Sequence, residues 1–317
     1  MKKAVFLTHA NPQGYRIQQY YPFLEKKGFD VELITTKAGF IDMVHSIKNS
    51  DVVYIQRLLF GSIKLSLIRR VSKRLVYDFD DAVMYGTKGE SQTRMKKFKN
   101  MVKRVDAVLC GSRFLLNEAI KYRKNNVFYC PTVVDIQDYP VKEHKDNMSV
   151  IIGWIGSKST LKYLSTLEGV FLKAKEKIPY IKYKIIADHA PEIKIGYIFE
   201  KWSKEKEKQG LLSFDMGVMP LRDDIWSRGK CGLKLIQYMA AGLPTISHPV
   251  GAVLEIIEDG LNGFIREDND GWIDAILTLA KDISLRKKIG SAARKTVQEK
   301  YSLQKWGPVV ADILDNL

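Results

Sequence analysis

Cysteine is scarce in this chain of 317 residues, which contains only Cys110, Cys130 and Cys231. Three thiols that lie far apart in the sequence exclude a disulfide scaffold and are typical of a protein of the reducing cytoplasm. The five histidines are dispersed as well, and no two of them have the spacing of metal ligands. The sequence therefore contains no motif for a structural metal site.

Long apolar runs and secretory signals are also missing. The apolar run Ala4–Leu7 stops at Thr8, far short of the apolar region of a signal peptide, so we expect a cytoplasmic protein. The stretch Leu235–Leu254 lacks Asp, Glu, Lys and Arg, but glycine, proline and polar residues interrupt it. We expect this stretch to form a helix, a short strand and a turn in a protein core.

Three motifs of well-known enzyme classes are absent: a Walker A loop, a Gly-x-Gly-x-x-Gly after the first strand, and a Gly-x-Ser-x-Gly. No aromatic string of the RNP1 type is present either. These absences argue against P-loop nucleotide hydrolysis, dinucleotide binding at the first strand, a Ser-His-Asp hydrolase and a common RNA-binding module.

Positive charge is what the chain has in excess. It contains 51 Lys and Arg against 36 Asp and Glu, a formal net charge of +15. Residues 1–145 hold 26 basic and 14 acidic residues, so +12 of the excess lies in the first half. This asymmetry predicts an anionic partner: nucleic acid, an acidic lipid surface or a phosphorylated substrate.

Short β-branched runs alternate with amphipathic stretches, and the pattern restarts in the second half. The expected strands are 4–8, 31–35, 52–56, 75–78 and 107–110, then 150–155, 183–187, 216–219, 245–247 and 263–265. Such alternation predicts an α/β fold with two Rossmann-like domains, parallel sheets and a ligand cleft at the carboxyl ends of the strands. We place the domains at residues 1–145 and 146–303, with a last helix at 304–317 that suits either domain.

The most informative segment follows the strand expected at 216–219. A loop with Arg222, Arg228 and Lys230 precedes a helix that is expected to begin near Gly232. Cations beside glycines at a helix N-terminus form a site for a phosphate or a diphosphate. A solvated charged loop explains the same local pattern equally well.

The segments after this loop resemble a known family. Met239–Pro244 reads Met-Ala-Ala-Gly-Leu-Pro, Gly251 and Glu255 follow, Glu258–Phe264 reads Glu-Asp-Gly-Leu-Asn-Gly-Phe, and Ile152–Ser157 reads Ile-Gly-Trp-Ile-Gly-Ser. Together they resemble the donor-binding domain of the retaining glycosyltransferases of family 4, which have the two-domain GT-B fold. The resemblance covers most of the second half of the chain and, more loosely, short motifs in the first half.

The resemblance implies transfer of a hexose-type residue from a nucleotide diphosphate sugar to a hydroxyl acceptor, in cell-surface glycan synthesis, with retention of configuration and no essential metal or other cofactor. The first domain then binds the acceptor and the second binds the donor. The donor-binding residues that it implies are Gly156, Ser157, Trp202, Arg228, Lys230, Cys231, Gly232 and Gln237. Those on the acceptor side are Gly14 and Arg16, and those at the reaction centre are Asp80, Asp81, Arg228 and Lys230.

Two departures from the family pattern affect these assignments. The family usually has two Glu residues eight positions apart, and this chain has Gly229 and Gln237 there. Gln237 is expected to accept hydrogen bonds from the ribose hydroxyls through its amide oxygen. Where the family often has His-Asp, this chain has Asp78–Asp81, so we expect Asp80 or Asp81 to bind substrate hydroxyls, with a helix N-cap as the alternative for Asp81.

Two other functions stay open at this point. One is a non-hydrolysing sugar-nucleotide epimerase, which would turn over a nucleotide sugar without an acceptor. The other is a nucleic-acid-binding protein, which only the net charge favours.

A basic amphipathic helix is expected at 94–105. Met95, Phe98, Val102 and Val105 share one face, and six basic residues flank it. Such a helix suits an anionic membrane surface on the inner membrane face and a lipid-linked acceptor. The same apolar stripe equally suits packing on the sheet.

Overall fold

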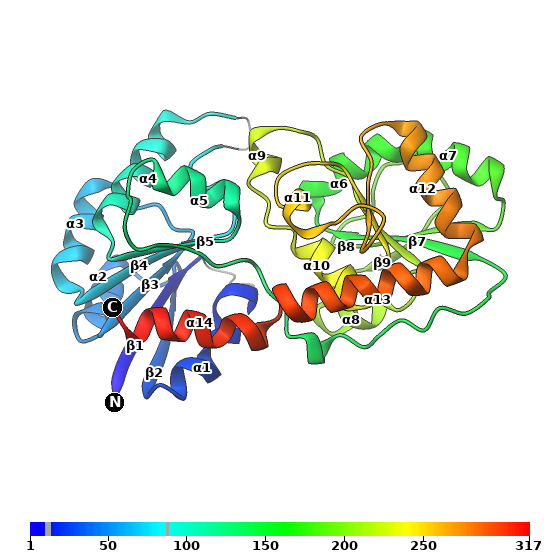
Figure 1. Cartoon of the computed structure of the whole chain (residues 1–317). Helices are drawn as coiled ribbons and strands as arrows, with labels where there is room; N and C mark the ends of the chain where they lie inside the picture. Colours follow the sequence, from blue (N-terminus) through cyan, green and yellow to red (C-terminus); the bar gives the residue numbers. More distant parts are fainter. Residues whose placement is uncertain (10–13, 87–88) are drawn as a thin grey trace. The chain divides into compact units, whose positions relative to one another are not determined.

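The computed structural model of the protein describes residues 1–9, 14–86 and 89–317 (Figure 1). Contacts divide the chain into two compact units. The first unit contains residues 1–133, 224–231 and 303–317, and the second contains residues 134–223 and 232–302. These bounds differ from the boundary expected at 145. Residues after 133 join the second unit because the backbone N–H of Lys142 donates to Ala241 and the ring of His144 bonds Gly242.

The first unit is built on a parallel six-stranded sheet. Its strand order is β2-β1-β3-β4-β5-β6. The strands are β1 (Lys2–Thr8), β2 (Phe29–Thr35), β3 (Val52–Gln56), β4 (Arg74–Phe79), β5 (Ala107–Cys110) and β6 (Val127–Tyr129). The sequence predicts the first five of these, whereas β6 is a half-buried edge strand without a long apolar run.

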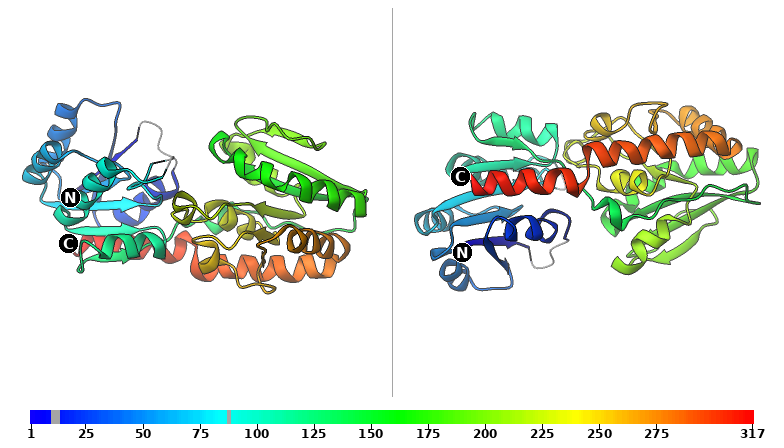
Figure 2. Two further views of the ribbon diagram at one scale, coloured as in Figure 1. Left: turned by 90° about the horizontal axis from the view of Figure 1, so that it is seen from above. Right: turned by 60° about the horizontal axis from the view of Figure 1, so that its bottom comes forward.

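Helices cover both faces of this sheet (Figures 1 and 2). The helices of this unit are α1 (Tyr21–Glu25), α2 (Phe40–Lys48), α3 (Ser62–Val71), α4 (Gln92–Arg104), α5 (Arg113–Ile120), α9 (Ile225–Arg228) and α14 (Leu303–Asp315), with 3-10 turns at Gly14–Arg16 and Gln18–Tyr20. Helix α14 packs on the first sheet, because Val310, Ala311 and Leu314 join the core that contains Phe6 and Tyr54. The last helix thus packs on the first of its two expected partners.

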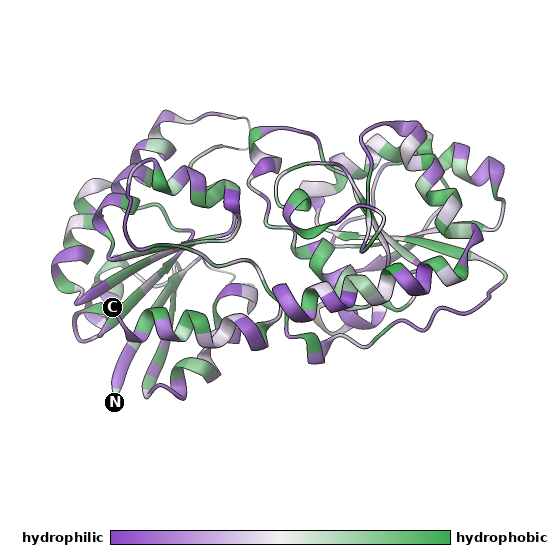
Figure 3. Cartoon of the chain, viewed as in Figure 1, coloured by the Kyte–Doolittle hydropathy of each residue, from purple (hydrophilic) through white to green (hydrophobic). Residues whose placement is uncertain are grey.

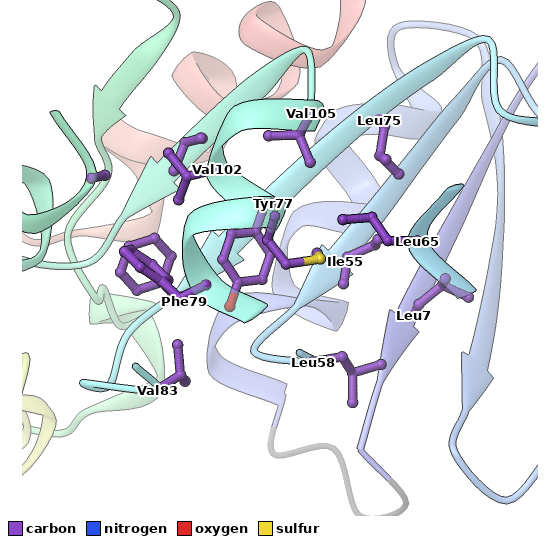
Figure 4. Close-up of a cluster of buried hydrophobic side chains, with 14 of the residues drawn as sticks. Leu7, Ile55, Leu58, Leu65, Leu75, Tyr77, Phe79, Val83, Val102 and Val105 are labelled. Carbon is purple, nitrogen blue, oxygen red and sulfur yellow. The ribbon is translucent and has the colours of Figure 1, made fainter. Parts of the chain in front are cut away.

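Strand alternation distributes the core of the first unit between two clusters. Leu7, Ile55 and Tyr77 point to one face, where α4 contributes Phe98 and Val102 (Figure 4). All five side chains are fully buried, so the apolar stripe of α4 packs on the sheet. Burial of such side chains contributes about 1.5–3 kcal/mol each to folding.

The second unit repeats this architecture on its own sheet of order β12-β11-β10-β7-β8-β9, again parallel throughout. The strands are β7 (Val150–Gly156), β8 (Ile181–Ala187), β9 (Ile198–Lys201), β10 (Met216–Met219), β11 (Thr245–Ser247) and β12 (Phe264–Ile265). The sequence predicts all but β9, which is an exposed edge strand.

Helices pack around the second sheet as well. They are α6 (Lys158–Leu164), α7 (Glu168–Lys177), α8 (Lys204–Leu211), α10 (Leu233–Ala240), α11 (Val253–Ile256), α12 (Asn269–Lys281) and α13 (Ile283–Lys300), with 3-10 turns at Ile136–Asp138 and Ser165–Leu167. In both units the helices carry hydrophilic and hydrophobic residues on different sides (Figure 3). This amphipathic pattern is what packing on a sheet requires.

The uncharged stretch Leu235–Leu254 forms most of α10, strand β11 and the turn into α11, as expected. Its residues before His248 are buried in the second unit. In the described part of the chain, no helix combines the length and the apolar character that crossing a bilayer requires.

Candidate functional site

A buried ion pair holds the carboxyl end of β4 in the first unit. The Arg16 guanidinium donates through Nε to Asp78 at 2.9 Å and through Nη2 to its other carboxylate oxygen. Its Nη1 donates to the carbonyl of Cys130 at 2.8 Å. Arg16 is 2% exposed and Asp78 is 0% exposed. Burial raises the pKa of Asp78, and the Arg16 charge opposes this rise. Arg16 therefore connects three segments from inside the unit; its expected acceptor-side role stays a prediction.

A chain of hydrogen bonds runs across the strand ends next to this pair. Thr8 at the end of β1 donates to Gln56 at 2.9 Å, and Gln56 donates to Asp80 at 3.2 Å. The Arg57 guanidinium bonds Asp80 at 2.9 Å and also contacts Asp81. Arg57 has a φ of 62°, a left-handed conformation that is rare for a residue with a side chain and often marks a functional site.

Asp80 and Asp81 do not cap a helix. The next helix, α4, begins at Gln92, and Ser91 caps it by accepting a hydrogen bond from the backbone N–H of Arg94. The N-cap considered for Asp81 is therefore not its role. The side chains of the two aspartates are 18% and 16% exposed, so both still reach solvent at the carboxyl edge of the sheet.

The loop 224–231 packs on the first unit, next to these aspartates. Lys230 Nζ lies 3.1 Å from Asp81 Oδ1 and 4.9 Å from the centre of the Trp226 ring. Residue 229 has no room for a side chain, so a Glu does not fit there. A Cβ at residue 229 would lie 2.4 Å from the Cβ of Ala82 and 2.9 Å from its backbone nitrogen. The structure thus joins two predicted groups, Asp80–Asp81 and the Arg228–Lys230 loop.

Three other predicted residues, Cys231, Arg228 and Gly14, lie in or near this part of the first unit. Cys231 is buried, and burial raises the pKa of its thiol to about 12, so the thiol stays protonated. A Cβ on Gly111 would lie 2.7 Å from the Cys231 sulfur, which shows how closely the two segments pack. Arg228 is exposed at the end of α9, and Gly14 begins the 3-10 turn that carries Arg16.

A pocket of about 490 Å³ lies over the carboxyl ends of the first-unit strands. Leu58, Phe60 and Trp226 form part of its apolar wall, and Asp81 and His9 are among its polar groups. The pKa of His9 is lowered, chiefly by burial and further by the charges of two nearby arginines. Its imidazole is therefore neutral at pH 7. Asp81 lines this pocket, which distinguishes it from Asp80.

The second unit contains the predicted Gly156–Ser157 turn at the end of β7. A Cβ on Gly156 would meet Trp154 at 2.2 Å and the Lys234 ammonium at 2.5 Å. That ammonium lies 4.4 Å from the Trp154 ring centre and donates to Thr160 Oγ1 at 2.8 Å. Gly156 therefore leaves the space that Lys234 and the Trp154 ring fill. Sequence reasoning did not single out Lys234, although it follows Gly232 by two positions.

Gln237 lies one turn further along α10, on the same side as Lys234. It is 3% exposed, and its amide nitrogen donates to Glu207 at 2.5 Å and to the Tyr139 hydroxyl at 3.2 Å. The other carboxylate oxygen of Glu207 accepts from the Trp202 indole at 2.7 Å. Glu207 on α8 thus joins two predicted donor-binding residues, Trp202 and Gln237. Its sequence surroundings, a run of Lys and Glu, gave no sign of this role.

No set of three or more His, Cys, Asp or Glu side chains is arranged as a metal site within the described ranges. Arg57, Lys234 and Glu207 were not predicted from the sequence, and the tertiary structure places them beside the predicted residues. Each belongs to a network that sequence-distant residues complete.

Comparison with known proteins supports the interpretation of the second unit. Residues 180–282 match the family model described as Glycosyl transferases group 1. This range includes Trp202, Glu207, Lys234 and Gln237. Among curated proteins, a 76-residue stretch is 37% identical to N-acetyl-alpha-D-glucosaminyl L-malate synthase of Bacillus anthracis, covering 23% of this chain and 20% of that protein.

A longer stretch of 163 residues is 26% identical to trehalose synthase of Pyrococcus horikoshii, covering 47% of this chain and 39% of that protein. The matches thus span between a fifth and two fifths of the length of these relatives.

Solved structures decide the fold. HepE of Anabaena, crystallised with UDP-glucose, has a TM-score of 0.77 at 16% identity, with both chains fully covered. Sucrose-phosphate synthase of Thermosynechococcus elongatus also has a TM-score of 0.77, at 13% identity, with 100% of this chain and 99% of that chain covered. The fold is the GT-B fold of two Rossmann-like domains. The expected fold class is therefore confirmed.

The tight packing of Gly229 predicts a measurable cost of any side chain there. Gly229→Ala should destabilise the protein by about 1–3 kcal/mol, because the backbone of Ala82 has to move. Gly61→Ser is the control in the same unit, since no atom lies within 4 Å of its built Cβ and serine is a favourable helix N-cap. Urea unfolding curves compare the two variants with the wild type. Equal midpoints for both variants would show that residue 229 has room for a side chain.

Proposed function

We propose that this protein is a glycosyltransferase that transfers a hexose-type residue from a nucleotide diphosphate sugar to a hydroxyl acceptor. The observation that carries this proposal is the polar cluster around α10, within the stretch that matches glycosyl transferases group 1. It combines a cation beside a glycine turn, a buried amide and carboxylate, and a half-buried indole. These groups suit a diphosphate, a ribose and a base in that order.

The chemistry asks little of the protein besides positioning and charge. The bond between the sugar C1 and the diphosphate oxygen breaks, C1 bonds to the acceptor oxygen, and the proton of the acceptor hydroxyl passes to the departing diphosphate. Cations that stabilise the departing diphosphate lower the barrier to this step. Lys234 of the second unit is proposed for that task. The diphosphate-binding role of Arg228 and Lys230 stays a prediction from the sequence, which a Lys230 variant tests. No metal or other cofactor is part of the proposal.

Asp81 is proposed to bind hydroxyls of the sugar or acceptor. It lines the first-unit pocket and is held in place by Arg57 and Lys230. Its carboxylate oxygens can accept hydrogen bonds from such hydroxyls, so its proposed role is to orient the sugar or the acceptor. Membership of family 4 and retention of the anomeric configuration are part of the proposal, and NMR of the product tests the latter.

A panel of nucleoside diphosphates provides the first test. The matching nucleotide at about 100 times its Kd should stabilise the protein by about 2.7 kcal/mol, which a thermal-shift assay detects. UDP is the first probe. Lys230→Ala should weaken binding about tenfold or more through loss of a charge-assisted hydrogen bond. Lys73→Ala, which removes an exposed cation paired with Asp51, is the control.

Absence of any shift across the panel would contradict the proposal. Turnover of a nucleotide sugar without any acceptor would instead indicate an epimerase.

The Glu207–Gln237 pair generates a second prediction, on the ribose. Because Gln237 lacks a charge, we propose that the adjacent Glu207 carboxylate supplies the strong acceptor for the ribose hydroxyls. Glu207→Gln should lower affinity about tenfold for a ribonucleoside diphosphate while leaving affinity for its 2′,3′-dideoxy analogue unchanged. Isothermal titration with both nucleotides gives the two affinities.

The exchange variant Glu207→Gln/Gln237→Glu serves as the matched control. It keeps one carboxylate and one amide in the pair, so we expect it to recover most of the ribonucleotide affinity. Equal losses for the ribonucleotide and the dideoxy analogue in Glu207→Gln would show a structural effect and reject contact with the ribose.

We also propose that exposed cations of α4 attract the protein to anionic membranes. The apolar stripe is buried, so only charges such as Lys96 and Lys103 reach a lipid surface. Each contributes about 1 kcal/mol near anionic lipid. Co-sedimentation with phosphatidylglycerol vesicles at low salt should exceed that with neutral vesicles and fall in Lys96→Gln/Lys103→Gln. Equal sedimentation with both vesicle types would reject membrane attraction.

A further inference from the structure

The first-unit pocket contains more positive charge than its own carboxylate balances. Arg57, Arg94 and Lys97 line it together with a single acidic residue, Asp81. Arg57 is committed to Asp80 and Asp81. Neither Arg94 nor Lys97 forms an ion pair with any carboxylate in the described part of the chain. The Arg94 Nε donates to the carbonyl of Val83 at 2.8 Å, which fixes the direction of its guanidinium while leaving its charge unbalanced.

The position of this pocket is that of a ligand site. It lies beyond the carboxyl ends of β1 to β4, and the strand order β2-β1-β3 reverses direction at β1. Open parallel sheets bind ligands at such switch points. The left-handed Arg57 is a further sign, because backbone strain of this kind is retained where the site needs it.

The other side chains of the pocket indicate what kind of group the rest of the ligand contains. Trp226 and Phe60 offer flat apolar surfaces, and Asp81 and the neutral His9 offer partners for hydroxyl groups. A polyol or sugar ring fits this combination. The two unbalanced cations lie on one helix, α4, three residues apart and therefore on the same side.

We propose that the acceptor of this enzyme is a hydroxyl compound that carries an oxyanion, a phosphate or a carboxylate, bound by Arg94 and Lys97. This inference rests on the proposed function, because it names the chemical class of the acceptor. It gives the positive charge of the first unit a specific role, distinct from the attraction of exposed cations to a membrane. A guanidinium and an ammonium together form charge-assisted bonds to a phosphate or carboxylate.

Titrations of the full chain with glucose 6-phosphate, glucuronate and glucose test the proposal, with inorganic phosphate as the minimal probe. The ring is the same in the three sugars, so differences in affinity report the anion. Calorimetry gives the affinities, and NMR follows the Trp226 indole and the His9 ring. Each titration is repeated with UDP at saturation.

The variant Arg94→Gln/Lys97→Gln removes the two pocket cations. The matched control is Arg70→Gln/Lys124→Gln, which removes one arginine and one lysine from exposed positions of the same unit that do not line the pocket. We expect at least one anionic sugar to bind about tenfold more tightly than glucose to the wild type and the control, and this preference to vanish in the pocket variant.

Three results would overturn the proposal: equal affinity of the wild type for all three sugars, a preference that persists in the pocket variant, and exclusion of phosphate by UDP. The last would assign the anion site to the donor diphosphate.

Competition of glucose 6-phosphate by phosphatidylglycerol vesicles would support a lipid-borne anion, and absence of competition would support a small soluble acceptor. Binding of UDP itself reports the proposed function separately.

Discussion

The first unit depends on one buried ion pair, between Arg16 and Asp78. Removing either partner would leave a buried charge unpaired, a change that costs about 3–5 kcal/mol in such surroundings. The pair also decides geometry, because Arg16 bonds the carbonyl of Cys130 while holding the end of β4. The two residues that follow Phe79, Asp80 and Asp81, are therefore presented at a fixed edge of the sheet. The contacts of Gln56, Arg57 and Lys230 with these two aspartates all lie at this edge.

The loop 224–231 packs so closely against Ala82 that no side chain fits at position 229. Gly229 stands where the resemblance to family 4 predicts a Glu, and any Cβ there would meet Ala82. The missing side chain allows the loop to lie against the residue after Asp81, which brings the Lys230 ammonium to that carboxylate. The charge next to the aspartates is supplied by Lys230 and Arg57.

Gln237 stands at the second position where the resemblance predicts a Glu, and its surroundings differ from those of Gly229. Gln237 brings no charge, but its amide donates to Glu207, a carboxylate from a neighbouring helix. A buried carboxylate needs donors, and the Gln237 amide together with the Trp202 indole provides them. The cluster therefore contains a carboxylate, which α8 supplies.

Hydrophobic periodicity alone determined the α/β class and ten of the strands, because buried parallel strands are continuous apolar runs. It missed β6 and β9, which are edge strands with little to bury. Local motifs likewise indicated the Gly156 turn, the Arg228–Lys230 loop and the Asp80–Asp81 pair. Tertiary structure alone decided that loop 224–231 and helix α14 pack on the first unit.

Only the tertiary structure shows that Arg57, Lys234 and Glu207 belong to the polar clusters. Each of them contacts residues that are distant in sequence or depends on a backbone conformation that its own residue type disfavours. The local sequence determines which face of a segment is apolar and therefore buried. It does not determine which distant charged residue pairs with a charged side chain of that segment, since this depends on how the strands and helices pack.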